Sequence, residues 1–379
     1  MLTTLARTLV AASILVASWV AVATLSGRPV AAGAAAAVLA ALAMLSARAT
    51  SHRAVWFNVA TVVVLWTAFD WRLRATDEEA DYQESFFSDV QFVLDDPLTG
   101  HRLAPGAVAH TRRSFRGETI YDVTYTTDDD GWRTVPGNRS DAGACVLVFG
   151  GSFAFGDGIG DGDTLAARLA VETAGRFTIH PFAAPGWGPQ HMLALVEGGR
   201  VEESLDCTPR FAIYVTIPEH VHRAACNPAA DGDPHGPRYR LDDGNPVRDG
   251  FCDDERREGG FGEAWAVSER LRRQAATQVG ERDLAVYRAV VVAAQRALVA
   301  RWPDLEFHVL AWRRGHTDYL AGDPAAAALA QHAVDQVLPG DEDWRERYEL
   351  PHDGHPTPLA NRLLAEYLTR EVLTPLDSP

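Results

Sequence analysis

The feature that most constrains this chain is the uneven distribution of its apolar and acidic residues. The first 70 residues are rich in Ala, Val and Leu, and Asp70 is their single acid, whereas all other acidic residues come from position 77 onward. Three apolar runs cover Leu5–Leu25, Pro29–Ala47 and Ala54–Phe69. A helix that spans a membrane needs about 20 apolar residues, with a range of about 17–25. The first two runs are therefore long enough to cross a membrane, and the third is slightly short.

These runs predict a membrane region over residues 1–74 with about three transmembrane helices, which would make this an integral membrane protein. Three tryptophans near the ends of the third run support this interpretation, because aromatic side chains concentrate at membrane interfaces. They are Trp56, Trp66 and Trp71. Three spans that start inside place the chain from about residue 75 outside, and so does a cleaved first segment followed by two spans. We therefore expect a multi-pass protein of the cell (plasma or inner) membrane with its main domain on the extracytoplasmic side.

The net charge of −16 belongs to the part of the chain that follows the apolar runs. A domain this acidic is a poor partner for nucleic acid. None of the four cysteines forms a Cys-x-x-Cys pair, which disfavours zinc ribbons and redox dithiols. Cys226 and Cys252 bracket a stretch rich in Asp, Gly and Pro, so a disulfide between them would close a loop in an oxidising compartment. The alternative is four ordinary thiols.

Residues 75–140 have the pattern of a small β-rich extension that packs on the main domain. Thr119–Thr126 alternates apolar and polar side chains, as a half-buried strand does. Asp128–Gly131 follows it as a turn.

Residues 141–379 alternate between short apolar runs and helical segments. The expected strands are Cys145–Phe149, Phe177–Phe182, Phe211–Ile217 and Leu305–Trp312, and the expected helices are Thr164–Thr173, Glu263–Trp302, Pro324–Val337 and Pro358–Leu373. Such alternation predicts an α/β fold in which helices cover both faces of a parallel sheet. Ligands bind at the carboxyl ends of the strands in sheets of this kind, so the segments that follow the strands are the ones to search for chemistry.

The first such segment is Gly150–Gly156, directly after the first apolar strand. Two glycines before Ser152 allow a tight turn, and the residues after it can open a helix. A serine at this place is exposed at the sheet edge beside backbone N–H groups that can bind an anion. The motif differs from the G-x-S-x-G elbow of the α/β-hydrolases, because Ala154 stands where that elbow needs glycine. The alternative is a glycine-rich turn with an incidental serine.

The second segment, Pro351–Pro358, precedes the last expected helix. A serine nucleophile needs a general base, and the base needs an acid that fixes its tautomer and stabilises the imidazolium. His355 and Asp353 can supply both functions from one loop. Two alternatives remain: the pair caps the following helix, or His352, Asp353 and His355 bind a metal ion, although no second cluster has metal-ligand spacing.

Two further segments follow the second and third strands. Gly186 lies in the turn after Phe177–Phe182, where a glycine lets its N–H approach a developing oxyanion. Glu219 and His220 follow the third strand, and a polar side chain there reaches the same edge of the sheet. The alternatives are a plain turn for the first segment and a salt-bridged loop for the second.

Taken in chain order, these segments resemble the blocks of the SGNH, or GDSL-like, hydrolase superfamily over roughly residues 144–379. The first block of the family is Gly-Asp-Ser with a Gly four residues after the Ser, and here it reads Gly151-Ser152 and Gly156, with Gly in place of the Asp. Gly186 matches the glycine of the second block. The third block of the family carries an Asn that donates to the oxyanion, and here Glu219 or His220 stands instead.

The fifth block of the family is Asp-x-x-His, and here it is one residue shorter, Asp353-Gly354-His355. That spacing resembles alginate O-acetyltransferase-like proteins, whose members transfer acetyl groups onto cell-surface polysaccharides. The resemblance implies a flavodoxin-like three-layer α/β/α fold, with Ser152 as nucleophile, His355 as base and Asp353 as the residue that orients it. It also implies an oxyanion site formed by the N–H groups of Ser152 and Gly186 with His220 as the third donor, and no metal or organic cofactor.

The sequence thus predicts a membrane-anchored serine esterase or O-acyltransferase that works through an acyl-Ser152 intermediate. The expected substrate is an acylated cell-surface carbohydrate or another ester, and an envelope protein is the expected partner if the acyl donor comes from the cytoplasm. Two alternatives stay open. The altered third block allows a catalytically inactive carbohydrate-binding or envelope-assembly module, and the residues of the fifth block allow a metal-dependent hydrolase.

Overall fold

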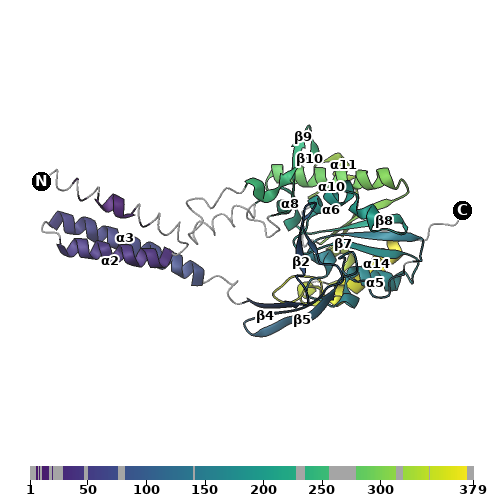
Figure 1. The fold of residues 1–379 in the computed structure, drawn as a ribbon, viewed down its shortest axis with the longest axis horizontal. Coiled ribbons are helices and arrows are strands. Elements are labelled where there is room, and N and C mark those ends of the chain that lie inside the picture. Colours follow the sequence, from purple (N-terminus) through teal and green to yellow (C-terminus); the bar gives the residue numbers. More distant parts are fainter. Residues whose placement is uncertain are drawn as a thin grey trace. The chain divides into compact units, whose positions relative to one another are not determined.

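The computed structural model of the protein describes most of the chain. The described residues are 6, 8, 11–16, 19, 29–46, 50–75, 82–139, 141–227, 235–255, 279–312, 319–340 and 342–373. The chain divides into two compact units, one formed by residues 1–80 and 256–278 and the other by residues 81–255 and 279–379 (Figure 1).

The first unit contains two helices that pack against each other, α2 (Pro29–Ser46) and α3 (Thr50–Ala75). Among the described residues, the part of α3 from Thr50 to Arg72 is the one stretch long and apolar enough to cross a membrane. The apolar part of α2 is shorter, Ala35–Met44, and most of Leu5–Leu25 lies outside the described residues. The described residues therefore support one span and not the expected three. The run Ala54–Phe69 by itself is slightly short for a span, but its helix α3 continues past both ends of the run, so Thr50–Arg72 qualifies.

The second unit is built around a five-stranded parallel sheet with the order β12-β11-β8-β6-β7. Its strands are β6 (Ala144–Gly150), β7 (Thr178–Ala183), β8 (Thr208–Thr216), β11 (Glu306–Ala311) and β12 (Ala330–Ala333). Counted along the chain within this sheet, the order is 2-1-3-4-5, which is the flavodoxin-like order. The strands β6 and β8 in the middle are almost completely buried, as expected of parallel strands with both faces covered. The predicted α/β class is confirmed.

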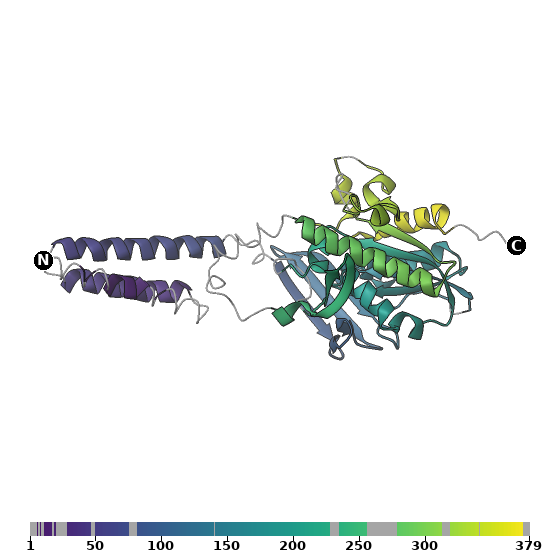
Figure 2. The same cartoon turned by 90° about the horizontal axis from the view of Figure 1, so that it is seen from above.

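Helices cover both faces of this sheet. Figure 1 shows α6, α8 and α10 on one face and α5 and α14 on the other, and the long α10 is also seen from above in Figure 2. Their bounds are α5 (Leu165–Glu172), α6 (Pro189–Glu197), α8 (Glu219–Ala224), α10 (Glu281–Arg301) and α14 (Pro358–Glu371). The shorter elements are α4 (Ser152–Phe155), η2 (Asp161–Asp163), α7 (Arg200–Glu203), η3 (Cys252–Glu255), α11 (Pro324–Ala327), α12 (Val334–Val337) and α13 (Trp344–Tyr348).

Two predicted helices differ from the structure. Pro324–Val337 is not one helix, because its middle forms β12, which pairs with β11 at the edge of the sheet. The alanine-rich sequence favours a helix locally, but the free edge of the sheet supplies backbone partners that outweigh this preference. Of the expected helix Glu263–Trp302, the structure describes the part that forms α10, and residues 263–278 lie outside the described residues.

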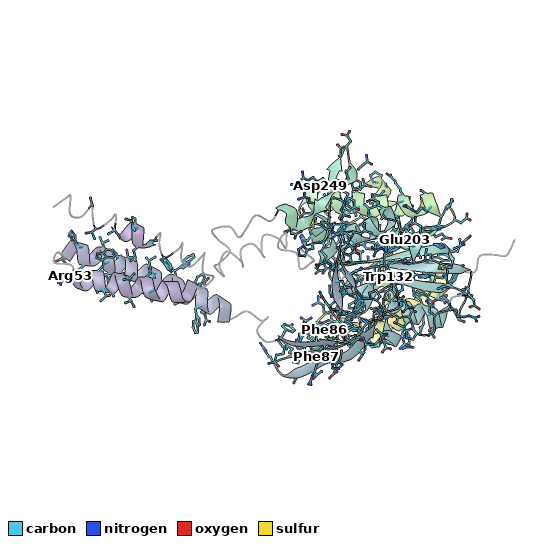
Figure 3. The ribbon with its side chains drawn as sticks, in the orientation of Figure 1. Arg53, Phe86, Phe87, Trp132, Glu203 and Asp249 are labelled. Carbon is cyan, nitrogen blue, oxygen red and sulfur yellow. A yellow bond between two sulfur atoms is a disulfide. The ribbon has the colours of Figure 1, made fainter. Side chains whose placement is uncertain are left out.

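The β-rich extension is present. An antiparallel sheet with the order β1-β4-β5 comprises β1 (Tyr82–Ser88), β4 (Val108–Phe115) and β5 (Glu118–Thr126), and β2 (Val93–Asp96) forms a hairpin with β3 (Gly100–Leu103). A second hairpin, β9 (Pro237–Asp242) with β10 (Asn245–Phe251), lies outside the extension. Trp132 joins the extension to the parallel sheet, since its ring packs on Phe182 at 4.8 Å in the interior (Figure 3). Both parts lie in the same compact unit. A boundary between 75–140 and 141–379 remains a prediction.

All four cysteines form disulfides. Cys226 pairs with Cys252, as predicted, and Cys145 at the start of β6 pairs with Cys207 before β8, a bond that the sequence did not suggest. Disulfides persist in oxidising compartments. Together with the apolar helix α3, they indicate an extracytoplasmic location for the second unit.

Candidate active site

Ser152 lies where β6 ends and α4 begins, at the carboxyl edge of the parallel sheet. The turn is held by its own backbone, because the carbonyl of Gly151 accepts hydrogen bonds from the N–H groups of Ala154 and Phe155 at 3.1 and 2.9 Å. A side chain at position 151 would not fit, since a Cβ there would lie 2.6 Å from the carbonyl oxygen of Trp187. The glycine before the serine is therefore required by the close approach of the neighbouring turn.

Asp353 and His355 lie on the loop between α13 and α14, and the loop brings them to Ser152. His355 Nε2 is 2.8 Å from Ser152 Oγ, and His355 Nδ1 is 2.5 Å from Asp353 Oδ1. The carboxylate of Asp353 is fully buried, and the imidazole of His355 is 15% exposed. The structure thus joins the three predicted residues in one continuous chain of hydrogen bonds.

The electrostatic environment favours an ionised acid and a basic imidazole. Burial lowers the pKa of His355, but the hydrogen bond to Asp353 and the negative charges of Asp157 and Asp353 outweigh it, so the pKa lies above the usual histidine value. Burial raises the pKa of Asp353, but the hydrogen bond and charge of His355 and the charge of Arg113 bring it below the usual aspartate value. Such a pair can accept a proton at Nε2 while the carboxylate stabilises the resulting cation.

Two aromatic side chains border the imidazole. The ring of Phe153 lies 4.9 Å from the ring of His355 and 5.5 Å from that of Trp312. Trp187 does not fill the site, because it is fully buried and stacks on His191 at 5.2 Å. Phe153 therefore forms an apolar wall beside the base, and Trp187 belongs to the core.

Gly186 lies in the turn after β7, the strand that pairs with β6. Because Gly150 pairs with Ala183, the turn that holds Gly186 follows the same edge of the sheet as Ser152. Gly186 has a φ of +84°, a left-handed conformation that glycine adopts without strain. The residue is half-buried.

Of the two candidates after β8, His220 faces the site and Glu219 does not. Glu219 is exposed, whereas His220 is completely buried in α8. His220 Nδ1 lies 2.7 Å from the hydroxyl of Tyr214, and Nε2, which has no hydrogen-bond partner among the described residues, faces the backbone of Gly151. Burial and the cation of Arg223 hold the pKa of His220 well below the usual value, so its ring is neutral.

The metal-binding alternative on this loop is not supported by the geometry. Both ring nitrogens of His355 are engaged, one with Ser152 and one with Asp353. The ring of His352 stacks on Phe115 at 4.2 Å. The metal-type group found among the described residues lies elsewhere and consists of Cys145, His180 and Cys207, whose two cysteines form a disulfide.

Two arginines of the extension contact this site, and neither was among the residues predicted from the sequence. Arg113 Nη1 lies 2.9 Å from Asp353 Oδ2. Arg133 is buried, and its guanidinium donates to the carbonyls of Phe155, Gly156 and Ile159 at 3.0, 2.7 and 2.6 Å, directly after Ser152. Both contacts join residues that are distant in sequence, and no local pattern marks them.

Comparisons with known proteins add three structures of low similarity. No family model and no curated protein matches the chain. A protein of Desulfitobacterium hafniense DCB-2 assigned to the lipolytic G-D-S-L family is 12% identical with a TM-score of 0.31 and covers 60% of this chain and 98% of its own. A protein of Agrobacterium tumefaciens str. C58 assigned as an arylesterase is 16% identical with a TM-score of 0.29 and covers 61% and 98%.

The third structure is a carbohydrate esterase family 2 enzyme with a carbohydrate-binding domain, from Corynascus thermopiles (Myceliophthora fergusii). It is 14% identical with a TM-score of 0.32 and covers 76% of this chain and 86% of its own. At these identities and scores the likenesses assign no family, so the functional argument rests on the geometry of the site.

Proposed function

We propose that this chain is a serine ester hydrolase or O-acyltransferase of the SGNH type that works through an acyl-Ser152 intermediate. The observation that supports it is the chain of hydrogen bonds from Ser152 through His355 to Asp353, which joins positions 203 residues apart in the sequence. A serine hydroxyl is a weak nucleophile, and a base within 2.6–3.2 Å of its oxygen, roughly the range for proton transfer, activates it.

In the proposed reaction, Ser152 Oγ attacks the carbonyl carbon of the ester while His355 Nε2 takes the hydroxyl proton. His355 then returns that proton to the leaving alcohol oxygen, and the acyl group remains on Ser152. In the second step water or a sugar hydroxyl attacks the acyl group, His355 accepts its proton, and the proton passes to Ser152 Oγ as the product leaves. Asp353 orients the imidazole and stabilises it when it carries both protons.

The oxyanion of each tetrahedral intermediate would be bound by the N–H groups of Ser152 and Gly186 and by His220. A neutral imidazole has one N–H, and when the Tyr214 hydroxyl donates to Nδ1 that N–H is on Nε2, which faces Gly151 beside the nucleophile. His220 would then serve in place of the asparagine of related proteins. Each such donor contributes about 3 kcal/mol to transition-state stabilisation.

The proposed setting is the outer side of the cell membrane, with α3 as the anchor. The disulfides and the apolar helix support this location. The proposed substrate is an acylated carbohydrate, which rests on the resemblance of the Asp353-Gly354-His355 spacing to alginate O-acetyltransferase-like proteins. An envelope protein that supplies an acyl donor would be needed for the transferase reaction, and the proposed chemistry needs no cofactor.

The test is ester hydrolysis by the full chain in detergent, with nitrophenyl acetate and with acetylated polysaccharide as substrates. We expect Ser152→Ala and His355→Ala to lower hydrolysis by about 10³-fold or more. His110→Ala is the matched histidine control, because its exposed ring pairs with Asp122 and lies outside this chain of hydrogen bonds. Wild-type activity in Ser152→Ala would contradict the proposal. A folded wild-type protein that hydrolyses no ester and binds glycans would favour a binding module.

A further inference from the structure

The acid of the proposed triad uses its two oxygens for different partners. Asp353 Oδ1 accepts from the Nδ1 and the backbone N–H of His355, while Oδ2 lies 2.9 Å from Arg113 Nη1. No part of the carboxylate is exposed to solvent. A buried carboxylate is unfavourable unless its lone pairs are satisfied, and Arg113 satisfies the oxygen that faces away from the base.

Arg113 lies on β4, on the face of the antiparallel sheet that is turned toward this loop. Its guanidinium stacks over the ring of Tyr82 with a separation of 4.9 Å, and Tyr121 and Glu84 are the other titratable groups beside it. The preceding residue, Arg112, points to the opposite face, where it is more exposed and lies near Asp122. Because successive side chains of a strand point to opposite faces of the sheet, Arg113 reaches the loop and Arg112 does not.

The same sheet also holds the backbone of the loop. The hydroxyl of Tyr82 donates to the carbonyl of His352 at 2.6 Å, and Phe115 stacks on the ring of His352. These contacts come from β1 and β4 and reach the residue directly before Asp353. The extension therefore acts on the loop in two ways, through the backbone and through the carboxylate.

We propose that Arg113 is a positioning residue of the active site: it fixes the Asp353 carboxylate so that Oδ1 faces His355 Nδ1, and it keeps that carboxylate ionised. The inference rests on the proposed function of the triad. Arg113 acts through Asp353 and touches neither the serine nor the base. Its role explains why an extension outside the parallel sheet carries an arginine at this register.

The role has an electrostatic consequence that can be measured. The charged groups that face His355 are Asp353 on its own loop, Asp157 after α4, and Arg113 from β4. The two carboxylates favour protonation of the imidazole, whereas the cation opposes it. Removal of the cation therefore raises the midpoint pH at which the Asp353–His355 pair takes up a proton.

The experiment follows the protonation of His355 in the full chain in detergent, by the pH dependence of deuterium exchange at its imidazole C2, read by peptide mass. We expect Arg113→Gln to move the midpoint upward by about one pH unit, because one charge is removed near the pair. Arg112→Gln is the matched control on the same strand and leaves the midpoint unchanged. An unchanged midpoint in a cooperatively folded Arg113→Gln protein would overturn the proposal.

If Arg113→Gln does not fold, Arg113→Lys tests the same assignment. Lysine keeps the cation but not the planar fork of the guanidinium. We therefore expect a midpoint pH close to that of the wild type. We also expect a fluorophosphonate to phosphonylate Ser152 about tenfold more slowly than in the wild type. A phosphonylation rate equal to that of the wild type would overturn the role of Arg113.

The same phosphonylation assay separates the two proposals. If the wild-type protein is not phosphonylated at any pH, both the proposed function and the positioning role of Arg113 are overturned. If the wild type is phosphonylated but Arg113→Gln leaves the midpoint pH of His355 unchanged, the positioning role of Arg113 alone is overturned.

Discussion

The loop that carries Ser152 and the loop that carries Asp353 and His355 meet at one edge of the parallel sheet, and different long-range contacts support them. Ser152 follows β6, a strand with neighbours on both sides, and its turn is closed by backbone hydrogen bonds within residues 151–157. The second loop is also closed by backbone hydrogen bonds, such as those from the N–H groups of Asp353 and Gly354 to the carbonyl of Leu350. Side chains of the antiparallel sheet contact this loop in addition.

Each loop has its own long-range contact from the extension. The end of β6 places Ser152, the proposed nucleophile, and Arg133 of the extension donates to the carbonyls that follow it. The extension places the base and the acid through Arg113 and Tyr82, which lie about 240 and 270 positions from the loop in the sequence. The β-rich extension therefore contacts both loops of the proposed active site.

The largest effect is expected on the second loop, at the acid. Asp353→Asn removes the charge that stabilises the imidazolium and fixes its tautomer, so the rate of ester hydrolysis should fall by about 10³- to 10⁴-fold while the protein remains folded. The measurement is hydrolysis of nitrophenyl acetate beside thermal unfolding. Asp343→Asn, at the exposed start of α13, is the control. Hydrolysis at the wild-type rate in Asp353→Asn would mean that the acid has no role.

A large effect on stability is expected on the first loop. Arg133→Met removes the ion-pair partner of Asp161, which keeps its hydrogen bonds from Thr126, and it removes one donor from each of the carbonyls of Phe155, Gly156 and Ile159. Loss of one partner of a buried pair costs about 3–5 kcal/mol, and chemical denaturation measures it. A loss below about 1 kcal/mol would show that the backbone turn holds the nucleophile without this arginine.

A substitution in the turn before Ser152 should lower the rate of ester hydrolysis. A Cβ in Gly151→Ala meets the Trp187 carbonyl at 2.6 Å, so the turn must shift and carry Ser152 with it. We expect hydrolysis to fall by about 10²-fold, because a displacement of about 1 Å has that effect. Gly160→Ala, where a Cβ meets nothing within 4 Å, should leave hydrolysis unchanged. Equal activity in both variants would contradict the close packing of this turn.

The pH dependence of ester hydrolysis should follow the protonation of His355 on the second loop. Protonated His355 cannot act as a base, so hydrolysis should fall about tenfold per pH unit below its folded pKa, which lies above the usual histidine value. The raised pKa of His355 also adds stability below the usual histidine pKa, and this stability disappears as the pH rises through the folded pKa. Denaturation of the wild type and of His355→Gln at several pH values measures it. An inflection at or below the usual histidine pKa would contradict the environment described.

The smallest effect is expected from the backbone contact of the second loop. Tyr82→Phe removes one hydrogen bond to the carbonyl of His352 and keeps the ring beneath Arg113. A hydrogen bond of this kind contributes about 1 kcal/mol, so unfolding free energy should fall by about that amount and hydrolysis by a few-fold. A loss of hydrolysis as large as that expected for Asp353→Asn would contradict the small contribution expected of this hydrogen bond.

Sequence patterns predicted the parallel sheet well, because buried strands such as Cys145–Phe149 are short, continuous apolar runs that end in glycine-rich turns. They also singled out Ser152, Asp353 and His355, which the structure brings within hydrogen-bond distance of one another; their catalytic role stays a prediction. The helix predicted over Pro324–Val337 was wrong, because pairing with β11 at the sheet edge outweighs the preference of alanine for helices.

What the sequence could not show are contacts between distant segments. Arg113 occupies an ordinary position in an alternating strand, and only the packing of the antiparallel sheet places it at Asp353. Arg133 and the Cys145–Cys207 disulfide are likewise defined by tertiary structure. The three expected membrane spans are not supported by the described residues, where Thr50–Arg72 alone qualifies and most of Leu5–Leu25 is not described.

The most direct test of the central claim is phosphonylation of the full chain in detergent by a fluorophosphonate, read by intact mass and peptide mapping. The arrangement of Ser152, His355 and Asp353 predicts one adduct per chain on Ser152, absent in Ser152→Ala and strongly slowed in His355→Ala. A folded wild-type protein that gains no adduct, or gains it on a different serine, would contradict Ser152 as the activated nucleophile.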